Sequence, residues 1–197
     1  MPPERPPQRL ARPEDAEAIQ EVMRVSAREL FPLYYDGRQT ASAVENIAHL
    51  DVQLIEDRTY FVHEADGEIL ACGGWSRRYK LWAGATPSTD DARLLDPGTE
   101  PARIRAMFVH PDWTRRGLGR AILDSSETAA RGEGFRSLIL GATRPGVPFY
   151  RAFGFREKEH VMVRAPNGVE VDCVVMERAI SAARTAPGRS RGGSRGP

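Results

Sequence analysis

The sequence has little net charge, few cysteines and no long apolar run, and each shortage excludes a class of protein. Its 28 basic and 27 acidic side chains leave a formal charge of +1 over 197 residues, so no overall field favours nucleic acid or an anionic membrane. No apolar segment approaches the roughly 20 residues that a membrane-spanning helix requires. Any affinity for an anion must therefore come from a local arrangement of residues.

Cysteine is scarce, and Cys72 and Cys173 are the only two in the chain. Both lie in apolar segments, without the paired spacing of a zinc site or the density of a disulfide scaffold. We therefore expect two buried free thiols and no bound metal. The opening residues, 1–8, are rich in proline and lack the apolar core of a secretory signal, so we expect a flexible N-terminus and a cytoplasmic protein.

The chain does have enough apolar residues, 41% of the total, to bury a sizeable core. Its length fits one domain, which we expect over residues 9–180. Residues 181–197 combine arginine with glycine, serine and proline and hold almost nothing apolar after Ala186. Such a composition predicts a disordered tail outside the fold.

Hydrophobic periodicity predicts a mixed α/β or α+β fold. The apolar spacing and the residues at the segment ends predict helices over 13–30, 42–50 and 147–153 and from residue 118 onward. Apolar and β-branched runs predict strands over 9–12, 59–64, 69–76, 104–109, 137–142, 160–164 and 169–178. Asp66-Gly67 and Pro166-Asn167-Gly168 mark hairpin turns, because these residues tolerate positive φ.

Residues 77–101 follow neither a helical nor a strand pattern. A segment of that length without secondary structure is usually functional or mobile. The strand over 104–109, the helix from residue 118 and the strand over 137–142 come next in order. They form one crossover unit, which predicts a parallel pair of strands.

The stretch from Val109 to Gly119 connects the first strand of this unit to its helix, and it has the composition of an anion site. Two glycines separated by one residue allow a tight turn that brings unpaired N–H groups to the start of a helix. Arg115 and Arg116 add positive charge at the same place. A phosphate or a diphosphate is the ligand that such a loop favours.

Three motifs in this order resemble the GNAT superfamily of acetyl-CoA-dependent N-acetyltransferases. They are Val109-x-Pro111 at the strand end, Arg116-Gly117-Leu118-Gly119 at the helix start, and Phe149-Tyr150-x-x-Phe153-Gly154-Phe155 about 30 residues later. The resemblance covers roughly residues 9–178 and is most specific over 104–155. It implies a central, mostly antiparallel sheet of about six to seven strands, with a parallel crossover pair and flanking helices.

The resemblance implies that acetyl-CoA is the co-substrate and that loop amides bind its diphosphate. The family usually has arginine or glutamine three residues before the first glycine, where this chain has Thr114. The family also splays the two parallel strands, so that backbone groups near Met107 and Val109 pair with the pantetheine amides. The implied cofactor-binding residues are Met107, Val109, Thr114, Arg115, Arg116, Gly117, Leu118, Gly119 and Arg120.

The implied reaction is direct attack of an amine on the thioester, followed by expulsion of a thiolate. Tyr150 occupies the position of the family's general acid, and a phenol of pKa near 10 is well matched to a thiol of pKa near 8.5. The alternative is that Tyr150 is only a core aromatic beside Phe149 and Phe153. The motif position favours the catalytic role.

The general base is less clearly marked, because residues 103–108 contain no carboxylate. Glu100, at the start of this strand, is the nearest candidate. Histidine is a residue type that can serve as a base, but His110 follows the strand, and we interpret it as a surface residue. The long loop adds three carboxylates that we interpret as solvated charge, Asp90, Asp91 and Asp96. A water chain, or an amine that is already partly neutral, would need no dedicated base.

The acceptor, by the same resemblance, is a primary amine of a small molecule or peptide. Aromatic residues border the expected cleft, and we assign Tyr34 and Tyr35 to its wall, with Arg77 as a contact for an acceptor carboxylate. Two alternatives stay open: a CoA-binding module without catalysis, and recruitment of a partner or nucleic acid through the arginine-bearing tail. The balanced charge makes nucleic acid the weaker alternative and gives no reason to expect a membrane partner, and a homodimer is left open.

Overall fold

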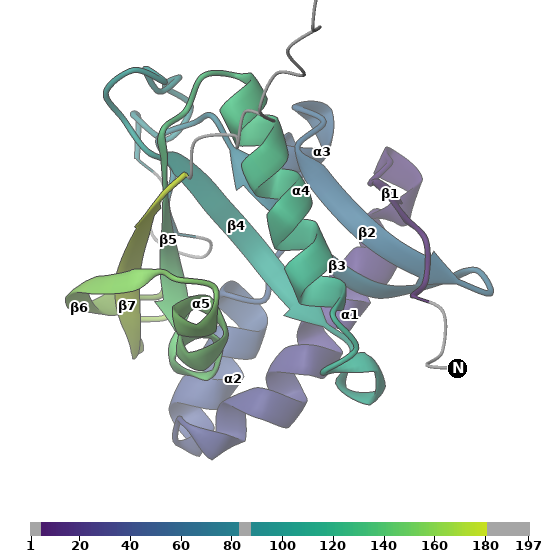
Figure 1. The fold of residues 1–197 in the computed structure, drawn as a ribbon. Helices are drawn as coiled ribbons and strands as arrows, with labels where there is room; N and C mark the ends of the chain where they lie inside the picture. Colours follow the sequence, from purple (N-terminus) through teal and green to yellow (C-terminus); the bar gives the residue numbers. More distant parts are fainter. Residues whose placement is uncertain (1–4, 83–87, 181–197) are drawn as a thin grey trace, which may run out of the picture.

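The computed structural model describes residues 5–82 and 88–180, which form a single seven-stranded sheet in the order β1-β2-β3-β4-β5-β7-β6 (Figure 1). Every neighbouring pair is antiparallel except β4 and β5, which are parallel. The predicted fold class is confirmed. The strands are β1 (Gln8–Leu10), β2 (Tyr60–Ala65), β3 (Glu68–Ser76), β4 (Ala102–Val109), β5 (Ser137–Thr143), β6 (Arg156–Arg164) and β7 (Glu170–Ala179).

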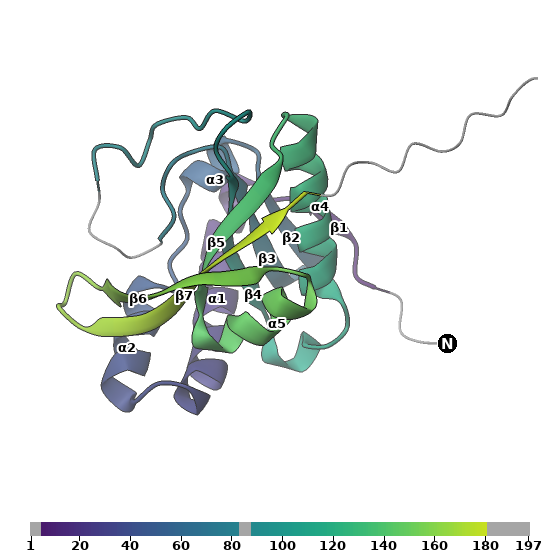
Figure 2. The same cartoon turned by 60° about the vertical axis from the view of Figure 1, so that its left-hand side comes forward.

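Helices cover both faces of the sheet, and this explains why almost every residue of β3 is buried. Helix α4 crosses one face over β3 and β4, while α1 packs on the opposite face and α2 packs against α1 (Figures 1 and 2). The helices are α1 (Ala16–Leu30), α2 (Gly37–Asn46), α3 (Gln53–Glu56), α4 (Leu118–Gly132) and α5 (Val147–Ala152). Short 3-10 turns η1 (Pro13–Asp15), η2 (Phe31–Leu33), η3 (Pro111–Trp113) and η4 (Arg144–Gly146) join them.

The core accordingly has one large cluster on each side of the sheet. Ile19, Met23 and Tyr60 belong to the cluster beneath α1, and Leu123, Leu138 and Tyr150 to the cluster beneath α4 and α5. Tyr150 is thus packed among aromatic and aliphatic side chains of the core.

The second helix begins earlier than its apolar pattern predicts. It runs over Gly37–Asn46, whereas the sequence suggested residues 42–50. The Asp36 side chain accepts a hydrogen bond from the Gln39 N–H at 2.7 Å, and the Gln39 side chain returns to the Asp36 N–H, which forms a capping box. The cap fixes the helix start, and the apolar residues beyond Asn46 pack outside the helix. The short helix α3 was not predicted at all, because four residues are too few to show a period.

The N-terminal segment, expected to be flexible through residue 8, is held in place from Pro6 onward. Gln8 is already part of β1, opposite His63 of β2. The Pro7 carbonyl accepts a hydrogen bond from the Glu64 N–H at 3.2 Å, and the Pro6 carbonyl lies 2.8 Å from His63 Nδ1. The predicted disordered tail, residues 181–197, lies outside the described residues.

The parallel strands β4 and β5 separate soon after they begin. Only Ala102 with Leu138 and Arg103 with Ile139 are paired, although both strands continue for several more residues (Figure 1). Among the described residues, β4 therefore pairs with no strand on its β5 side from Ile104 onward. A gap of this kind leaves backbone N–H and C=O groups available to a ligand.

Within residues 5–82 and 88–180, no helix combines the length and the apolar character needed to cross a bilayer.

Candidate active site

The loop from β4 to α4 ends in an uncapped helix N-terminus. Gly117 is the N-cap residue with φ of 81°, Arg115 has φ of 60°, and no side chain of the described residues caps the helix. The first helical hydrogen bond here runs from the Ala121 N–H to the Gly117 carbonyl at 3.0 Å. The three N–H groups before it are left for a ligand, and the helix dipole favours a negative one.

This helix start meets α5, although the two are far apart in the sequence. A Cβ atom placed on Gly119 would lie 3.5 Å from the Phe149 ring and 3.6 Å from Val109 Cγ2. The end of β4, the first turn of α4 and the aromatic face of α5 therefore converge on Gly119. A larger side chain here would enter the space between the loop and α5.

Two arginines of the loop region lie over aromatic rings. Arg116 lies 4.4 Å from the Trp113 ring centroid and Arg120 lies 5.4 Å from that of Phe153. The Thr114 hydroxyl donates to the Pro111 carbonyl at 2.9 Å, so this side chain stabilises the turn itself. Positive charge surrounds the helix N-terminus, and cation–π contacts orient part of it.

A cavity opens where β4 and β5 separate. Tyr150 lines it together with the second half of β4 and the end of β5. Its walls are mostly apolar and aromatic: Ile47, Leu81, Trp82, Ile104, Arg105, Ala106, Met107, Phe108, Gly141, Ala142, Thr143, Gly146, Tyr150 and Cys173. A cleft that combines apolar side chains with exposed polar groups can hold a small molecule.

Tyr150 is 8% exposed and packs edge-on against Phe149 and Phe155, with ring centroids 5.1 and 5.8 Å away. Within the described chain its hydroxyl forms no hydrogen bond, so it is available to a ligand in the cavity. Burial raises the pKa of Tyr150 above its ordinary value of about 10. The phenol therefore keeps its proton at neutral pH.

A bulge in β4 shapes part of the wall of the cavity that Tyr150 also lines. The register with β3 shifts between Cys72 and Gly74, and Ala106 has φ of 49°. The buried Tyr60 hydroxyl donates to the Ala106 carbonyl at 2.6 Å and so supports the bulge. Nothing in the local sequence around Ala106 marked this bulge or the role of Tyr60, since both depend on pairing between distant strands.

Trp82 forms a second wall that sequence reasoning missed. Its ring lies over Gly141 of β5, where an added Cβ would be 2.3 Å from the ring carbon Cζ3. Only glycine leaves room for the indole at this point. A tryptophan in a segment without periodicity gives no hint of which strand it covers.

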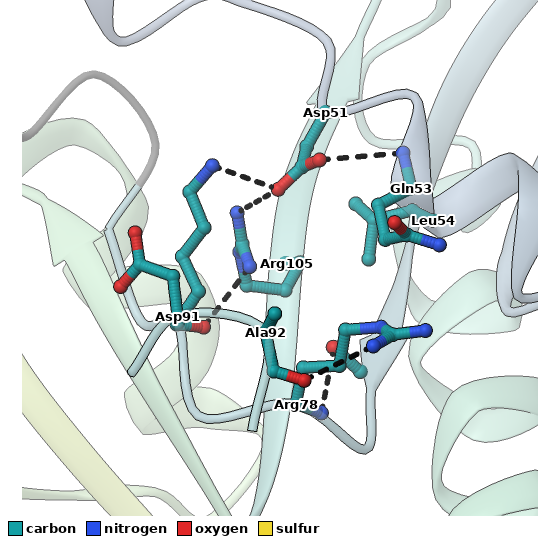
Figure 3. Close-up of a pocket in the computed structure, with 9 residues that line it drawn as sticks. Asp51, Gln53, Leu54, Arg78, Asp91, Ala92 and Arg105 are labelled. Carbon is teal, nitrogen blue, oxygen red and sulfur yellow. Dashed lines mark hydrogen bonds and ion pairs between the residues drawn. The ribbon is translucent and has the colours of Figure 1, made fainter. Parts of the chain in front are cut away.

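A second, charged cavity lies beside the first, and Arg105 lines both. In Figure 3 the Asp51 carboxylate points toward Arg105; it lies 3.1 Å from Arg105 Nη2 and accepts a hydrogen bond from the Gln53 N–H at 3.3 Å. Lys80 Nζ also lies 3.1 Å from the Asp51 carboxylate. Burial acts to raise the pKa of Asp51, but the charges of Arg105 and Lys80 outweigh it and hold the pKa below its usual value.

The family profile described as "Acetyltransferase (GNAT) family" matches residues 20–155, well over half of the chain. The chain belongs to the GNAT family. A curated N-acetyltransferase from Methanocaldococcus jannaschii is 38% identical over 65 residues. That match covers 32% of this chain and only 29% of the relative, so it extends over less than a third of the relative's length.

Solved GNAT structures share the fold over nearly the whole chain. A GCN5-related N-acetyltransferase from Rhodopseudomonas palustris aligns with a TM-score of 0.68 and 20% identity, over 89% of this chain and 96% of that one. PaiA N-acetyltransferase from Thermoplasma acidophilum, solved in complex with coenzyme A, aligns with a TM-score of 0.60 and 16% identity. That alignment covers 88% of this chain and 98% of PaiA.

In this GNAT chain Glu100 is bound away from the Tyr150 cavity, which disfavours the predicted role as base. Its carboxylate accepts two hydrogen bonds from Arg93, at 2.7 and 2.9 Å, and one from the Asp96 N–H at 2.9 Å. The Arg93 side chain above all, then the Asp96 N–H, lowers the pKa of Glu100 to about 2. A carboxylate with so low a pKa is a weak base. Its hydrogen bonds to Arg93 and Asp96 stabilise the loop between β3 and β4.

The three residues predicted to contact the acceptor do not line the cavity either. Tyr34 is 50% exposed, outside the cavity, and Arg77 Nη2 lies 2.7 Å from Glu133 Oε1 at the far end of α4. Tyr35 is 7% exposed, and its hydroxyl donates to the Asp172 carbonyl and accepts from the Arg144 N–H, both at 2.8 Å. Tyr35 therefore links the segment after η2 to β7 and to η4.

Both cysteines are buried free thiols, as predicted. Cys173 also lines the cavity that contains Tyr150. Burial raises the pKa of the Cys173 thiol to about 12, so almost none of it is thiolate at neutral pH. Among the described residues no cluster of histidine, cysteine, aspartate and glutamate could hold a metal ion.

Proposed function

We propose that this protein is an N-acetyltransferase that moves an acetyl group from acetyl-CoA to the primary amine of a small molecule or peptide. One observation carries the proposal. The separation of β4 and β5 opens a cavity in which the Tyr150 hydroxyl has no protein partner within the described chain. An uncapped helix N-terminus lies at the end of the same strand. A thioester on a carrier that contains a diphosphate requires both: a cavity for the thioester and an anion site for the diphosphate.

The diphosphate would bind at the start of α4. The free N–H groups after Gly117 and the nearby arginines supply donors and positive charge for it. The pantetheine arm would then extend along the unpaired side of β4, where Met107 and Val109 offer backbone groups. The coenzyme A bound to PaiA, which has the same fold, is consistent with this cofactor.

Acetyl transfer would proceed by direct attack. The amine nitrogen forms a bond to the thioester carbon, the carbonyl electrons move onto oxygen, and the tetrahedral species collapses as the C–S bond breaks. The sulfur takes both electrons of that bond and a proton, which Tyr150 is placed to donate. A phenol that is kept protonated by burial suits this role.

The cavity favours direct transfer over an acyl-enzyme. Cys173 is the thiol on its wall, and a thiol with a pKa of about 12 is a poor nucleophile at neutral pH. No carboxylate or histidine is among the described residues that line this cavity. We therefore infer that the acceptor amine arrives neutral or loses its proton to water, and that Glu100 takes no part.

Tyr150→Phe tests the proposal, with Tyr34→Phe as the control because Tyr34 is exposed outside the cavity. Both would be assayed by thiol release from acetyl-CoA across a panel of amines, amino acids and peptides. Losing a general acid should lower kcat about 100-fold or more in Tyr150→Phe and leave CoA affinity within about twofold. An unchanged kcat would remove Tyr150 from the mechanism. CoA binding without turnover on any amine would favour the binding-module alternative.

A further inference from the structure

We propose that Arg5, which precedes β1, is a cofactor-binding residue that contacts the diphosphate of coenzyme A. The proposal rests on the function proposed above and adds a residue more than 100 positions away from the glycine loop. No motif in the sequence connects the two.

The Arg5 guanidinium lies beside the residue that opens α4. A Cβ atom added to Gly117 would be 3.5 Å from Arg5 Nη2 and 3.9 Å from Arg5 Cζ. Gly117 is the N-cap, and the free N–H groups of the first helical turn follow it directly. A cation at this position and the helix N-terminus attract the same anion.

The segment that carries Arg5 is fixed to two elements of the fold. His63, which is 1% exposed, places Nδ1 2.8 Å from the Pro6 carbonyl, and the Glu64 N–H donates to the Pro7 carbonyl at 3.2 Å. The Gln8 side chain donates to Ser125 Oγ of α4 at 2.9 Å. These contacts hold the backbone next to Arg5 against β2 and α4, so little ordering of the chain is needed when a ligand binds.

Arg5 is also available for a ligand. It is exposed, and within the described chain it forms no ion pair or hydrogen bond. Arg116 and Arg120, by contrast, lie over the rings of Trp113 and Phe153. The position three residues before Gly117 carries Thr114, whose hydroxyl is used within the turn. Arg5 supplies from outside the loop a cation that this loop position lacks.

The test compares Arg5→Gln with Arg24→Gln in the full-length protein. Arg24 is an exposed arginine of α1, on the face of the sheet opposite α4, so the control removes the same charge away from the site. Calorimetric titrations would use coenzyme A, 3′-dephospho-coenzyme A and pantetheine, which differ in their phosphates. Thermal unfolding of both variants would verify that the fold is kept.

The Kd of Arg5→Gln should rise about fivefold to tenfold for coenzyme A and by the same factor for the dephospho form. Pantetheine, which has no diphosphate, should bind both variants equally. A coenzyme A Kd within twofold of that of Arg24→Gln would overturn the proposal. A loss confined to coenzyme A, with the dephospho form unaffected, would also overturn it, since Arg5 would then contact the 3′-phosphate. If the wild-type protein binds coenzyme A no better than pantetheine, the proposed function itself fails.

Discussion

Two regions next to β4, the loop that follows the strand and the charged cavity beside Arg105, are built in different ways. Where the strand leads into α4, the site consists of backbone: two residues with positive φ, a glycine N-cap and unpaired N–H groups. Beside the charged cavity, the site consists of side chains that meet from distant segments, with Arg105 of β4 paired to Asp51 from the loop before α3. Arg78 is likewise paired to Asp57, which follows α3.

The contrast shows how each region responds to change. A backbone site depends on a few glycine positions and tolerates most changes of neighbouring side chains. A site of buried ion pairs depends on every partner, because removing one leaves a charge without compensation. Conservative substitutions should therefore be much more harmful in the charged cavity than in the loop.

The largest effect is expected for Asp51→Asn. Arg105, whose side chain is 2% exposed, would lose its carboxylate partner, and the free energy of unfolding should fall by about 3 kcal/mol. Lys80→Gln is the control, since it leaves the pair with Arg105 intact and should cost under about 1 kcal/mol. Urea unfolding of both variants measures the difference. Equal losses would mean that the Asp51–Arg105 pair contributes no more to the free energy of unfolding than the Asp51–Lys80 pair.

A smaller effect is expected for Gly117→Ala. Alanine is strained by about 1 kcal/mol at φ of 81°, so the loop should shift and CoA affinity should fall about tenfold. Gly132→Ala in the last turn of α4 is the matched control, because a Cβ there meets nothing within 4 Å. It should leave CoA affinity unchanged and raise stability slightly. Calorimetry with coenzyme A tests both, and equal affinities would show that the backbone of Gly117 does not form the site.

Gly141→Ala probes the wall shared by Trp82 and β5. The added methyl would collide with the indole at 2.3 Å, so kcat/KM for the acceptor should fall about fivefold while CoA affinity stays constant. Tryptophan fluorescence should report the displaced ring. In a Trp82→Ala background, Gly141→Ala should not lower kcat/KM further. A further fivefold fall there would show that the collision with Trp82 does not cause the loss.

The smallest effect concerns pH. The Arg78 side chain lowers the pKa of Asp57, so this carboxylate stabilises the fold above its unfolded pKa of about 3.9. That contribution, about 1 kcal/mol, is lost as the pH falls below about 4 through the lower pKa of the folded state. Asp57→Asn should therefore show a shallower loss of stability from pH 5 to 2 than the wild type. Asp124→Asn, at an exposed position of α4, should follow the wild-type curve.

Much of the fold could be predicted because its signals are local. Asp66 and Gly67 adopt φ of 52° and 80° between β2 and β3, as their turn chemistry implies. Gly154, with φ of 94°, follows the predicted short helix α5. The start of α2 was placed too late because the apolar period was given more weight than the cap at Asp36, a signal that the sequence did contain.

The sequence alone determined the glycine loop, the order of the strands and of every helix except α3, and the place of Tyr150 in its motif, because each depends on backbone preferences or periodicity within a few residues. Only the tertiary structure decided that Asp51 meets Arg105 and that Arg5 lies beside Gly117. These contacts join segments with no fixed spacing in the chain. They form only when strand pairing and helix packing bring distant side chains together, and no local preference encodes that distance.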